Sequence, residues 1–498
     1  MTAPGTAPQA SSQAAATTGR PPSIAIIGGG VAGLAAAFLL RDADLAVTVL
    51  EGSPSLGGKL AVSEVAGIPV DAGAEALLAR RPEGTGLIAE LGRTEELELP
   101  GTTSAGIWTR GRVRQLPRRQ FMGVPADFGE LAATGIVSAE GMARARQDLT
   151  LPGTQSGADE SVTSRVGGRL GSEVVDRMVE PLLGGVYAGR CDDLSFYATL
   201  PALAEAARGH RSLAAAAASL LPPAPAPGRG ADSGAAGQSV PPPVFTTLTG
   251  GLGTLPPTLA ARSGALIRTS AMVRALARTA TGWRLTIGSA HEPEWLDADA
   301  VIIAVPATPA SRLLAGVAAQ AAATLGEIRY ASMAIVTLAY PIAAFPEPVT
   351  GSGFLVPAVD GRAVKAVTFS TVKWPHLIAA EPGVHVVRCS VGRLGEEAVL
   401  QRDDAELAAL AAADLADATG VRGAPVDTRV TRWGGALPQY SVGHLDRVAR
   451  IRSAVAAVPG LAVCGAAYDG VGIPACIATA RLAADQVLAY VGSQDASS

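Results

Sequence analysis

The sequence predicts an α/β fold whose central layer is a parallel, Rossmann-like sheet assembled from separate parts of the chain. Three observations lead to this prediction. A short apolar run, Ile24–Ile27, is followed at once by a glycine-rich turn and a helical pattern. A second apolar run, Ala300–Val305, has the same buried character. The last block repeats a strand, a glycine-rich turn and a helix from about Gly472. Uninterrupted apolar runs of this length are typical of strands covered on both faces.

The first turn carries a G-x-G-x-x-G motif. Gly28 permits the tight turn, Gly30 lets a pyrophosphate approach the backbone, and Gly33 lets the helix and the strand pack closely. Val31 and Ala32 begin the predicted helix, whose free N–H groups would face the phosphates. A glycine-rich turn without a ligand is the alternative, and the next strand and its acidic end favour the dinucleotide.

The next predicted strand, Ala46–Leu50, ends in the acidic Glu51. At this position a carboxylate holds the ribose hydroxyl groups of a bound dinucleotide. Gly52 comes next, and the glycine pair Gly57 and Gly58 follows after a short loop. A backbone without Cβ atoms can pass close to the same pyrophosphate there. We therefore predict that both glycine-rich segments face one dinucleotide.

The choice between NAD and FAD depends on the residues after Glu51. The glycine pair with the basic Lys59 behind it resembles the flavoproteins that have two dinucleotide-binding domains. A later glycine-rich stretch, TGGLGTLP at Thr249–Pro256, follows no predicted strand, so one dinucleotide must do the chemistry. A flavin that receives no electrons from a nicotinamide cofactor takes them from a substrate and passes them to oxygen or another acceptor. The sequence therefore predicts a FAD-dependent oxidase or dehydrogenase.

The composition narrows the functional classes. A chain of 498 residues with a net charge of −4 is long enough for two or three domains and has no basic field for nucleic acid. Its four cysteines show no metal-binding spacing, which favours buried thiols in a reducing compartment. The N-terminus has no signal-peptide pattern, and no apolar stretch reaches the ~18 residues that span a bilayer. We expect a cytoplasmic protein without metal, and peripheral membrane contact stays open.

Lysine is rare in this arginine-rich chain. Only Lys59, Lys365 and Lys373 occur, the first beside the glycine pair and the other two on either side of AVTFSTV. Chance survival of these lysines and a functional role are equally compatible with the sequence.

Several stretches resemble the oxygen-dependent protoporphyrinogen and coproporphyrinogen III oxidases. They are MVEPLLGGVYAGRCDDLSFYATLP (178–201), GSGFLVP (351–357), AVTFSTVKWPH (366–376), RWGGALPQYSVGH (432–444) and GAAYDGVGIPACI (465–477). With the N-terminal motif they cover nearly the whole chain, in the order that the family has. The N-terminal motif alone would indicate only the wider flavin amine oxidase superfamily.

The resemblance implies a discontinuous FAD-binding domain like that of para-hydroxybenzoate hydroxylase, a substrate domain with a mixed sheet, and a helical domain. The expected parts are a disordered tail (1–22), the FAD-binding domain (23–70, 244–308 and 455–492), the substrate-binding domain (71–109 and 309–454), the helical domain (110–204) and a flexible Ala/Pro-rich insertion (205–243). In the helical domain we predict that Val174, Val175, Met178 and Leu182 share one buried face.

The resemblance also assigns residues to the flavin. Gly73 lies in the segment that passes beside the flavin in this family, and the backbone of Val273 is expected at the adenine. Trp433 and the turn of Val471, Gly472 and Ile473 are expected at the flavin end.

Arginine suits the propionate groups of a porphyrinogen, because its guanidinium grips a carboxylate with two hydrogen bonds. Arg80 and Arg81 come after the flavin-side segment and are the preferred candidates, with Lys373 as a third. Gly185 could let the chain approach the macrocycle closely. Solvated surface arginines and an ordinary helix end are the alternatives. The five histidines show no dyad or triad spacing, so no catalytic residue besides the flavin itself is predicted.

The expected reaction is the oxidation of coproporphyrinogen III to coproporphyrin III in heme biosynthesis. It removes six electrons in three hydride steps, with O2 as the acceptor and H2O2 as the product. The expected partners are the porphyrinogen, molecular oxygen and downstream heme-pathway enzymes. Protoporphyrinogen IX oxidase is the first alternative, and a flavin amine oxidase or a non-catalytic binding protein of related fold are the others.

Overall fold

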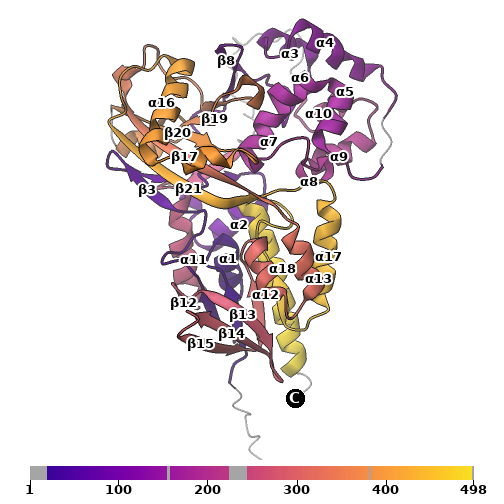
Figure 1. Cartoon of the computed structure of the whole chain (residues 1–498), viewed down its shortest axis with the longest axis vertical. Coiled ribbons are helices and arrows are strands. Elements are labelled where there is room, and N and C mark those ends of the chain that lie inside the picture. The colour runs from indigo at the N-terminus through magenta and orange to yellow at the C-terminus, as the bar shows by residue number, and fades with distance from the viewer. Residues whose placement is uncertain (1–19, 154–156, 224–243, 381–382, 496–498) are drawn as a thin grey trace, which may run out of the picture.

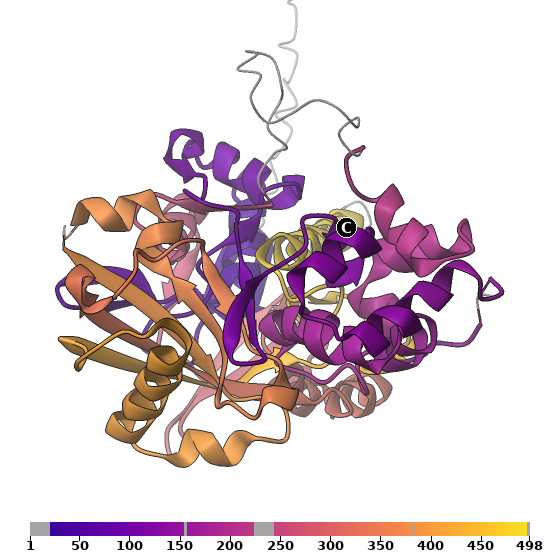
Figure 2. The same ribbon diagram turned by 90° about the horizontal axis from the view of Figure 1, so that it is seen from above.

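The computed structural model describes residues 20–153, 157–223, 244–380 and 383–495. In Figure 1 a parallel sheet with its helices lies in the lower half. A larger mixed sheet and a group of helices lie above it, and Figure 2 shows these two units next to each other when the molecule is seen from above.

The parallel sheet is built from strands that are far apart in the sequence. Its order is β12-β2-β1-β16-β22, and every neighbouring pair is parallel. The strands are β1 (Ser23–Ile27), β2 (Ala46–Leu50), β12 (Leu266–Arg268), β16 (Ala300–Ile303) and β22 (Leu461–Val463). The strands predicted at Ile24–Ile27, Ala46–Leu50 and Ala300–Val305 are confirmed. β16 ends two residues earlier than predicted, because the chain turns at Pro306 into the next helix.

Helices cover both faces of this sheet, as continuous apolar strands require. Side chains at Ile24 and Ile26 enter one core, and those at Ala25 and Ile27 enter the other, because successive residues of a strand point to opposite faces. The first core is covered by α1 (Val31–Leu39), α11 (Leu255–Ser263) and α18 (Ile473–Asp495). The second is covered by α12 (Ala307–Leu314), α13 (Ala319–Gly326), α17 (His444–Ala456) and the antiparallel strands β13 (Val273–Arg278), β14 (Trp283–Gly288) and β15 (Pro293–Ala298).

The mixed sheet has the strand order β21-β17-β20-β19-β18-β7-β8. Its strands are β7 (Gly106–Thr109), β8 (Arg112–Gln115), β17 (Tyr330–Pro341), β18 (Gly353–Leu355), β19 (Val364–Phe369), β20 (Val384–Val391) and β21 (Asp427–Pro438). One face carries an apolar core that is covered by α16 (Asp404–Thr419). We call the opposite face, which carries Met333, Thr337, Arg388 and Trp433, the inner face. It contacts residues 72–75 of the chain.

The third unit consists of helices around a separate apolar core. They are α3 (Phe128–Thr134), α4 (Ala139–Arg146), α5 (Gly168–Leu170), α6 (Ser172–Val174), α7 (Glu180–Tyr187), α8 (Phe196–Thr199), α9 (Pro201–Arg208) and α10 (Leu213–Ser219). Val174, Val175 and Met178 are buried as predicted, but Leu183 and not Leu182 joins them. The cause is a π-helical turn over Val175–Val179, which adds a residue to the turn and shifts the buried face by one position.

Two further expectations need correction. Residues 205–208 belong to α9 and residues 213–219 form α10, in which Leu213, Ala216 and Ala217 are buried, so this part is not a flexible insertion. The rest of the predicted insertion from residue 224 to 243, and most of the predicted tail, lie outside the described residues. The glycine-rich stretch from Thr249 does follow a strand, β11 (Phe245–Leu248). That strand pairs antiparallel with β5 (Leu77–Leu78) and β6 (Leu97–Glu98), outside the parallel sheet.

The remaining elements join these units. They are β3 (Val62–Val65), β4 (Ile68–Asp71), α2 (Pro82–Glu90), β9 (Gln120–Phe121), β10 (Val124–Pro125), α14 (Ser370–Lys373) and α15 (Pro375–Ala380). In the part of the chain that the structure describes, no helix has the length and apolar character needed to cross a bilayer. All four cysteines are buried and unpaired.

Candidate functional site

The first glycine turn has the geometry that its three glycines permit. Gly28 has a φ of +112°, and a Cβ atom there would lie 2.7 Å from the carbonyl oxygen of Ala304. A Cβ at Gly33 would lie 1.9 Å from the carbonyl oxygen of Gly28, so only glycine lets α1 approach β1 this closely. Gly30 differs, because the space in front of it is open to a distance of 4 Å. The turn therefore leaves a hollow at Gly30, before Val31 and Ala32.

The second glycine pair closes on this turn. Gly57 donates its N–H to the carbonyl oxygen of Gly29 over 2.9 Å and forms a parallel bridge with Gly30. The Cβ position of Gly58 lies 3.5 Å from the Cα atom of Gly30. The two predicted glycine segments are thus brought together, although the 23 residues 34–56 separate them in the sequence.

Glu51 supports the turn through both carboxylate oxygens. Its Oε2 accepts the N–H of Gly29 over 2.7 Å, and its Oε1 accepts the N–H of Ser53 over 2.8 Å. A carboxylate oxygen has more than one acceptor site, so these bonds leave room for ribose hydroxyl groups. Gly52 packs against Met272, which places Val273, at the start of β13, beside this loop.

Lys59 and Gly73 lie side by side. A Cβ at Gly73 would be only 2.0 Å from the carbonyl oxygen of Lys59, and Ala74 donates its N–H to that oxygen over 3.1 Å. Burial lowers the pKa of the Lys59 ammonium, while Cys476 at the start of α18 acts in the opposite direction. Among the described residues no carboxylate pairs with Lys59. It is therefore a half-buried cation beside the glycine turns that lacks an anionic partner.

Trp433 reaches the same segment from the inner face. Its indole N–H donates to the carbonyl oxygen of Ala72 over 2.9 Å, and its ring edge lies 3.2 Å from the Cβ position of Gly73. On the other side α18 begins at Ile473, directly after the half-buried Val471 and the exposed Gly472. Val471 also packs against the core of the helical unit.

A cluster that sequence reasoning missed holds residues 73–75 in place. Glu75 Oε1 accepts a hydrogen bond from Lys373 Nζ over 2.7 Å, and its other oxygen pairs with Arg388 Nη1. Arg388 Nη2 also donates to the carbonyl oxygen of Gly73 over 2.5 Å. Burial alone would raise the pKa of the Glu75 carboxyl, but the two cations override it and lower the pKa to about 2. Charged residues about 300 positions apart gave no local signal of this cluster.

Asp71 anchors the later glycine-rich loop. Its carboxylate accepts the N–H groups of Leu252 over 3.0 Å and Gly253 over 2.8 Å. Burial raises the pKa of Asp71, and these two backbone hydrogen bonds oppose that rise. The amide groups before α11 thus already bind an anion of the protein itself.

The candidate substrate residues have different surroundings. The Arg81 guanidinium donates to Glu83 over 2.7 Å, whereas Arg80 is exposed and lies 6.0 Å above the Phe121 ring. Lys373 is inside the Glu75 cluster, and its Nζ is 5.7 Å from the Phe245 ring. Gly185 is exposed in α7, and only Leu355, 3.6 Å from its Cβ position, lies close to it.

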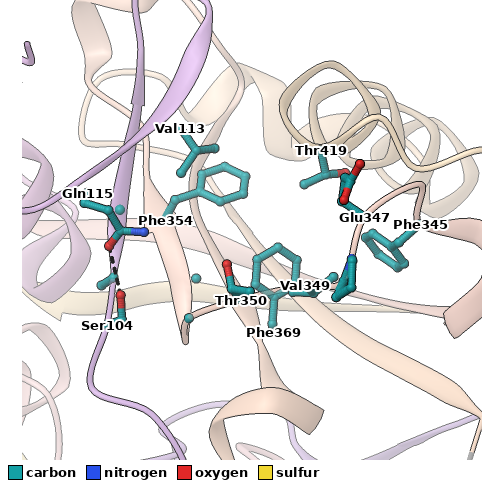
Figure 3. Close-up of a pocket in the computed structure, with 15 residues that line it drawn as sticks. Ser104, Val113, Gln115, Phe345, Glu347, Val349, Thr350, Phe354, Phe369 and Thr419 are labelled. Carbon is teal, nitrogen blue, oxygen red and sulfur yellow. Dashed lines mark hydrogen bonds between the residues drawn. The ribbon is translucent and has the colours of Figure 1, made fainter. Parts of the chain in front are cut away.

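A cavity of about 230 Å³ lies elsewhere, at the edge of the mixed sheet (Figure 3). Phe345, Phe354 and Phe369 line it, and Ser104 donates to Gln115 at its rim over 2.8 Å. These phenylalanines belong to the core on the face opposite the inner face. Phe354 therefore faces away from Trp433, which lies on the inner face.

Comparison with known proteins gives a consistent result. The model of the family described as flavin containing amine oxidoreductase matches residues 31–488. The chain is similar to the coproporphyrinogen III oxidase of Mycobacterium tuberculosis, with 37% identity over 480 residues that cover 95% of this chain and 99% of the relative. It is 32% identical to the coproporphyrinogen III oxidase of Bacillus subtilis over 478 residues, which cover 94% and 98% of the two chains.

A crystal structure from Exiguobacterium sp. 255-15, named as a candidate protoporphyrinogen oxidase, has the same fold. The TM-score is 0.80 at 29% sequence identity, and the match covers 94% of this chain and 98% of the other. The likeness spans the parallel sheet, the mixed sheet and the helical unit together.

Proposed function

The chain belongs to the flavin containing amine oxidoreductase family and, within it, to the group of the coproporphyrinogen III oxidases, and from that premise we propose that it oxidises coproporphyrinogen III to coproporphyrin III. It is a FAD-dependent oxidoreductase. The observation that carries the proposal is the meeting of the glycine turns with the inner face at Gly73, where Trp433 comes within contact distance.

The residues present fit FAD. Gly30 faces open space beside the glycine pair, so it forms a cradle that a Cβ atom would fill. We propose that Glu51 accepts hydrogen bonds from the ribose hydroxyl groups, and that a phosphate or the flavin supplies the counter-charge that Lys59 lacks among the described residues. When bound, FAD accepts hydride equivalents from the substrate and passes their electrons to an acceptor, for which we propose molecular oxygen.

The chain's own residues bind FAD, orient it and shield it from water. We propose that the adenosine half lies along Gly28–Gly33, Glu51–Gly52 and the backbone of Val273. The flavin half then lies along Gly57–Lys59, Gly73, Trp433 and the turn Val471–Ile473. The Glu75 cluster fixes the Gly73 carbonyl, so the backbone beside the flavin is held by two cations and one carboxylate.

We propose that the macrocycle lies between this region and α7, with Gly185 allowing a close approach. Arg80 is the better placed of the two arginines for a propionate, because Glu83 already occupies Arg81. Lys373 is already paired with Glu75, so its effect on a propionate depends on this cluster. Holding the macrocycle close to its oxidant in a fixed orientation is the main contribution that such a site has to make.

The test is direct. Purified protein should carry a visible flavin absorption band and should convert coproporphyrinogen III into fluorescent coproporphyrin III. Three molecules of O2 should be consumed and three of H2O2 formed for each porphyrin, because six electrons leave in three pairs. Flavin-containing protein that leaves coproporphyrinogen III unoxidised, under conditions where the spontaneous reaction is suppressed, would contradict the proposal.

Protoporphyrinogen IX is the second candidate substrate, and the name given to the Exiguobacterium structure supports it. The two substrates differ in the number of propionates, so the site does not need a different fold to choose between them. An amine substrate is tested in the same assay by H2O2 release from primary amines and polyamines.

A further inference from the structure

Lys365 lies at an irregularity of its strand that turns its side chain toward the inner face. It lies on β19, where the pairing with β20 skips from Val364 opposite Val391 to Ala366 opposite Ser390. This irregularity makes Lys365 an extra residue, and bulges of this kind redirect a side chain. The Lys365 Nζ atom lies 4.0 Å from the Sδ atom of Met333, so the side chain is on the inner face.

The surroundings of Lys365 disfavour its charge. The residue is 4% exposed, and the only hydrogen-bond partner described for its Nζ is the Met333 thioether, a weak acceptor. Burial and the nearby Arg393 lower the pKa of the Lys365 ammonium to about 7, and Glu396 opposes them. On the neighbouring strands the inner face carries Met333 on β17 and Trp433 on β21, which do not titrate, and Arg388 on β20, whose charge is paired with Glu75. A substantial fraction of the side chain is therefore a neutral amine near pH 7.

The amine also lies between the two sides of the proposed substrate region, which are Trp433 with the Gly73 segment and α7 with Gly185. Met333 is directly opposite Trp433 in the sheet, and directly opposed residues of an antiparallel pair share a face. Trp433 in turn bonds to the segment of Gly73. In the other direction α7 packs on β19, and Leu355, on the strand next to Lys365, lies 3.6 Å from the Cβ position of Gly185.

We propose that the amine of Lys365 is the base that takes up a pyrrole N–H proton while hydride leaves the adjoining bridge carbon. The inference deepens the proposed function and rests on it. In such a step one bridge C–H bond breaks and its electron pair leaves with hydrogen as a hydride, for which the bound flavin would be the acceptor. One pyrrole N–H bond breaks, its proton goes to the Lys365 Nζ atom, and its electron pair enters the new π bond of the macrocycle. The porphyrin keeps two of the four N–H groups and one C–H at each bridge, so two of the three steps take their proton from N–H. The remaining proton leaves the last CH2 bridge, whose electron pair completes the π system, and the ammonium releases each proton to solvent before the next step.

The closing experiment combines kinetics with a spectrum that does not depend on turnover. Lys365→Met keeps an unbranched side chain of nearly the same length and removes the amine, and Lys365→Arg keeps a cation that cannot become a neutral base. We expect kcat to fall about 100-fold in both, the lower end of what a positioned base contributes. The acid limb of the wild-type kcat profile, near pH 7, should vanish in Lys365→Met, while the flavin absorption stays unchanged. Activity of Lys365→Ala should return with added ethylamine.

Because the chain has only three lysines, protein labelled with 13C-lysine gives few side-chain signals. The signal that disappears in Lys365→Met should titrate near pH 7 in the flavin-loaded protein. Wild-type kcat with a retained acid limb in Lys365→Met, or full activity in Lys365→Arg, would overturn the role of Lys365 and leave the proposed function standing. Failure of the wild-type protein to oxidise any porphyrinogen would overturn the proposed function, and the lysine titration would still be readable.

Discussion

The guanidinium of Arg388 donates to the carbonyl oxygen of Gly73 over 2.5 Å. Arg388 comes from β20 of the mixed sheet, and Gly73 comes from the segment that runs past the glycine turns. The bond therefore joins the proposed substrate unit to the proposed cofactor unit at the point where both meet Trp433. Glu75 lies between Arg388 and Lys373 and pairs with both cations, one through each carboxylate oxygen.

Glu75→Gln should destabilise the protein markedly. It leaves Lys373 and Arg388 buried without their counter-charge, and breaking a buried pair in this way costs about 3–5 kcal/mol. The midpoint of thermal unfolding measures the effect. Glu83→Gln is the matched control, because it breaks a half-exposed pair with Arg81 that is worth at most about 1 kcal/mol. Equal shifts in the two variants would show that the Glu75 cluster does not stabilise the contact between the two units.

The same carboxylate gives a pH dependence with a definite sign. The pKa of Glu75 is about 2 in the folded protein, below its ordinary value of 4.5. Its contribution to stability is therefore complete above pH 4.5 and is lost as the pH falls from there towards 2. Thermal midpoints measured across this range should fall less steeply in Glu75→Gln than in the wild type. Parallel curves would remove Glu75 as the cause.

Gly30→Ala and Gly33→Ala should separate cofactor binding from folding. Gly30 has a φ of −75° and open space in front of it, so alanine fits the protein but occupies the proposed pyrophosphate cradle. We expect a folded protein that has lost its flavin absorption band. Gly33→Ala places a methyl group 1.9 Å from a backbone oxygen, so it should lower the unfolding temperature of the apoprotein as well. Full flavin content in Gly30→Ala would contradict the placement of FAD.

Arg80→Ala should raise the KM for coproporphyrinogen III about fivefold, since an arginine contact in a wet site is worth on the order of 1 kcal/mol. Arg81→Ala should have a smaller effect, because Glu83 already neutralises this guanidinium. Neither variant should change the spectrum of bound flavin. An unchanged KM in both would mean that the propionates are held elsewhere.

Local patterns made much of the cofactor side predictable. The strand at Ile24, the glycine spacing and Glu51 lie within about 30 residues of one another, so they form a local motif that the sequence shows directly. The structure places these residues together, and their contacts with FAD stay a prediction. Strands β1 and β16 were also predictable, because their burial on both faces leaves continuous apolar runs.

Features that depend on a shifted register or a distant charge were not predictable. The π-helical turn at Val175 moves the buried position from Leu182 to Leu183, and no periodicity shows it. The bulge at Lys365 turns a lysine inward in the same way. Glu75 meets Arg388 from 313 positions away, which only the folded topology determines. Glu83, by contrast, is two residues from Arg81, and the sequence alone could have suggested that pair.

The central claim is the substrate, and the most direct measurement is a comparison of initial rates on coproporphyrinogen III and protoporphyrinogen IX. Porphyrin fluorescence follows both reactions in the same flavin-loaded preparation, and Gly30→Ala serves as the flavin-free control. We predict a kcat/KM for coproporphyrinogen III that is clearly the higher of the two. A clear preference for protoporphyrinogen IX would contradict this account of the substrate.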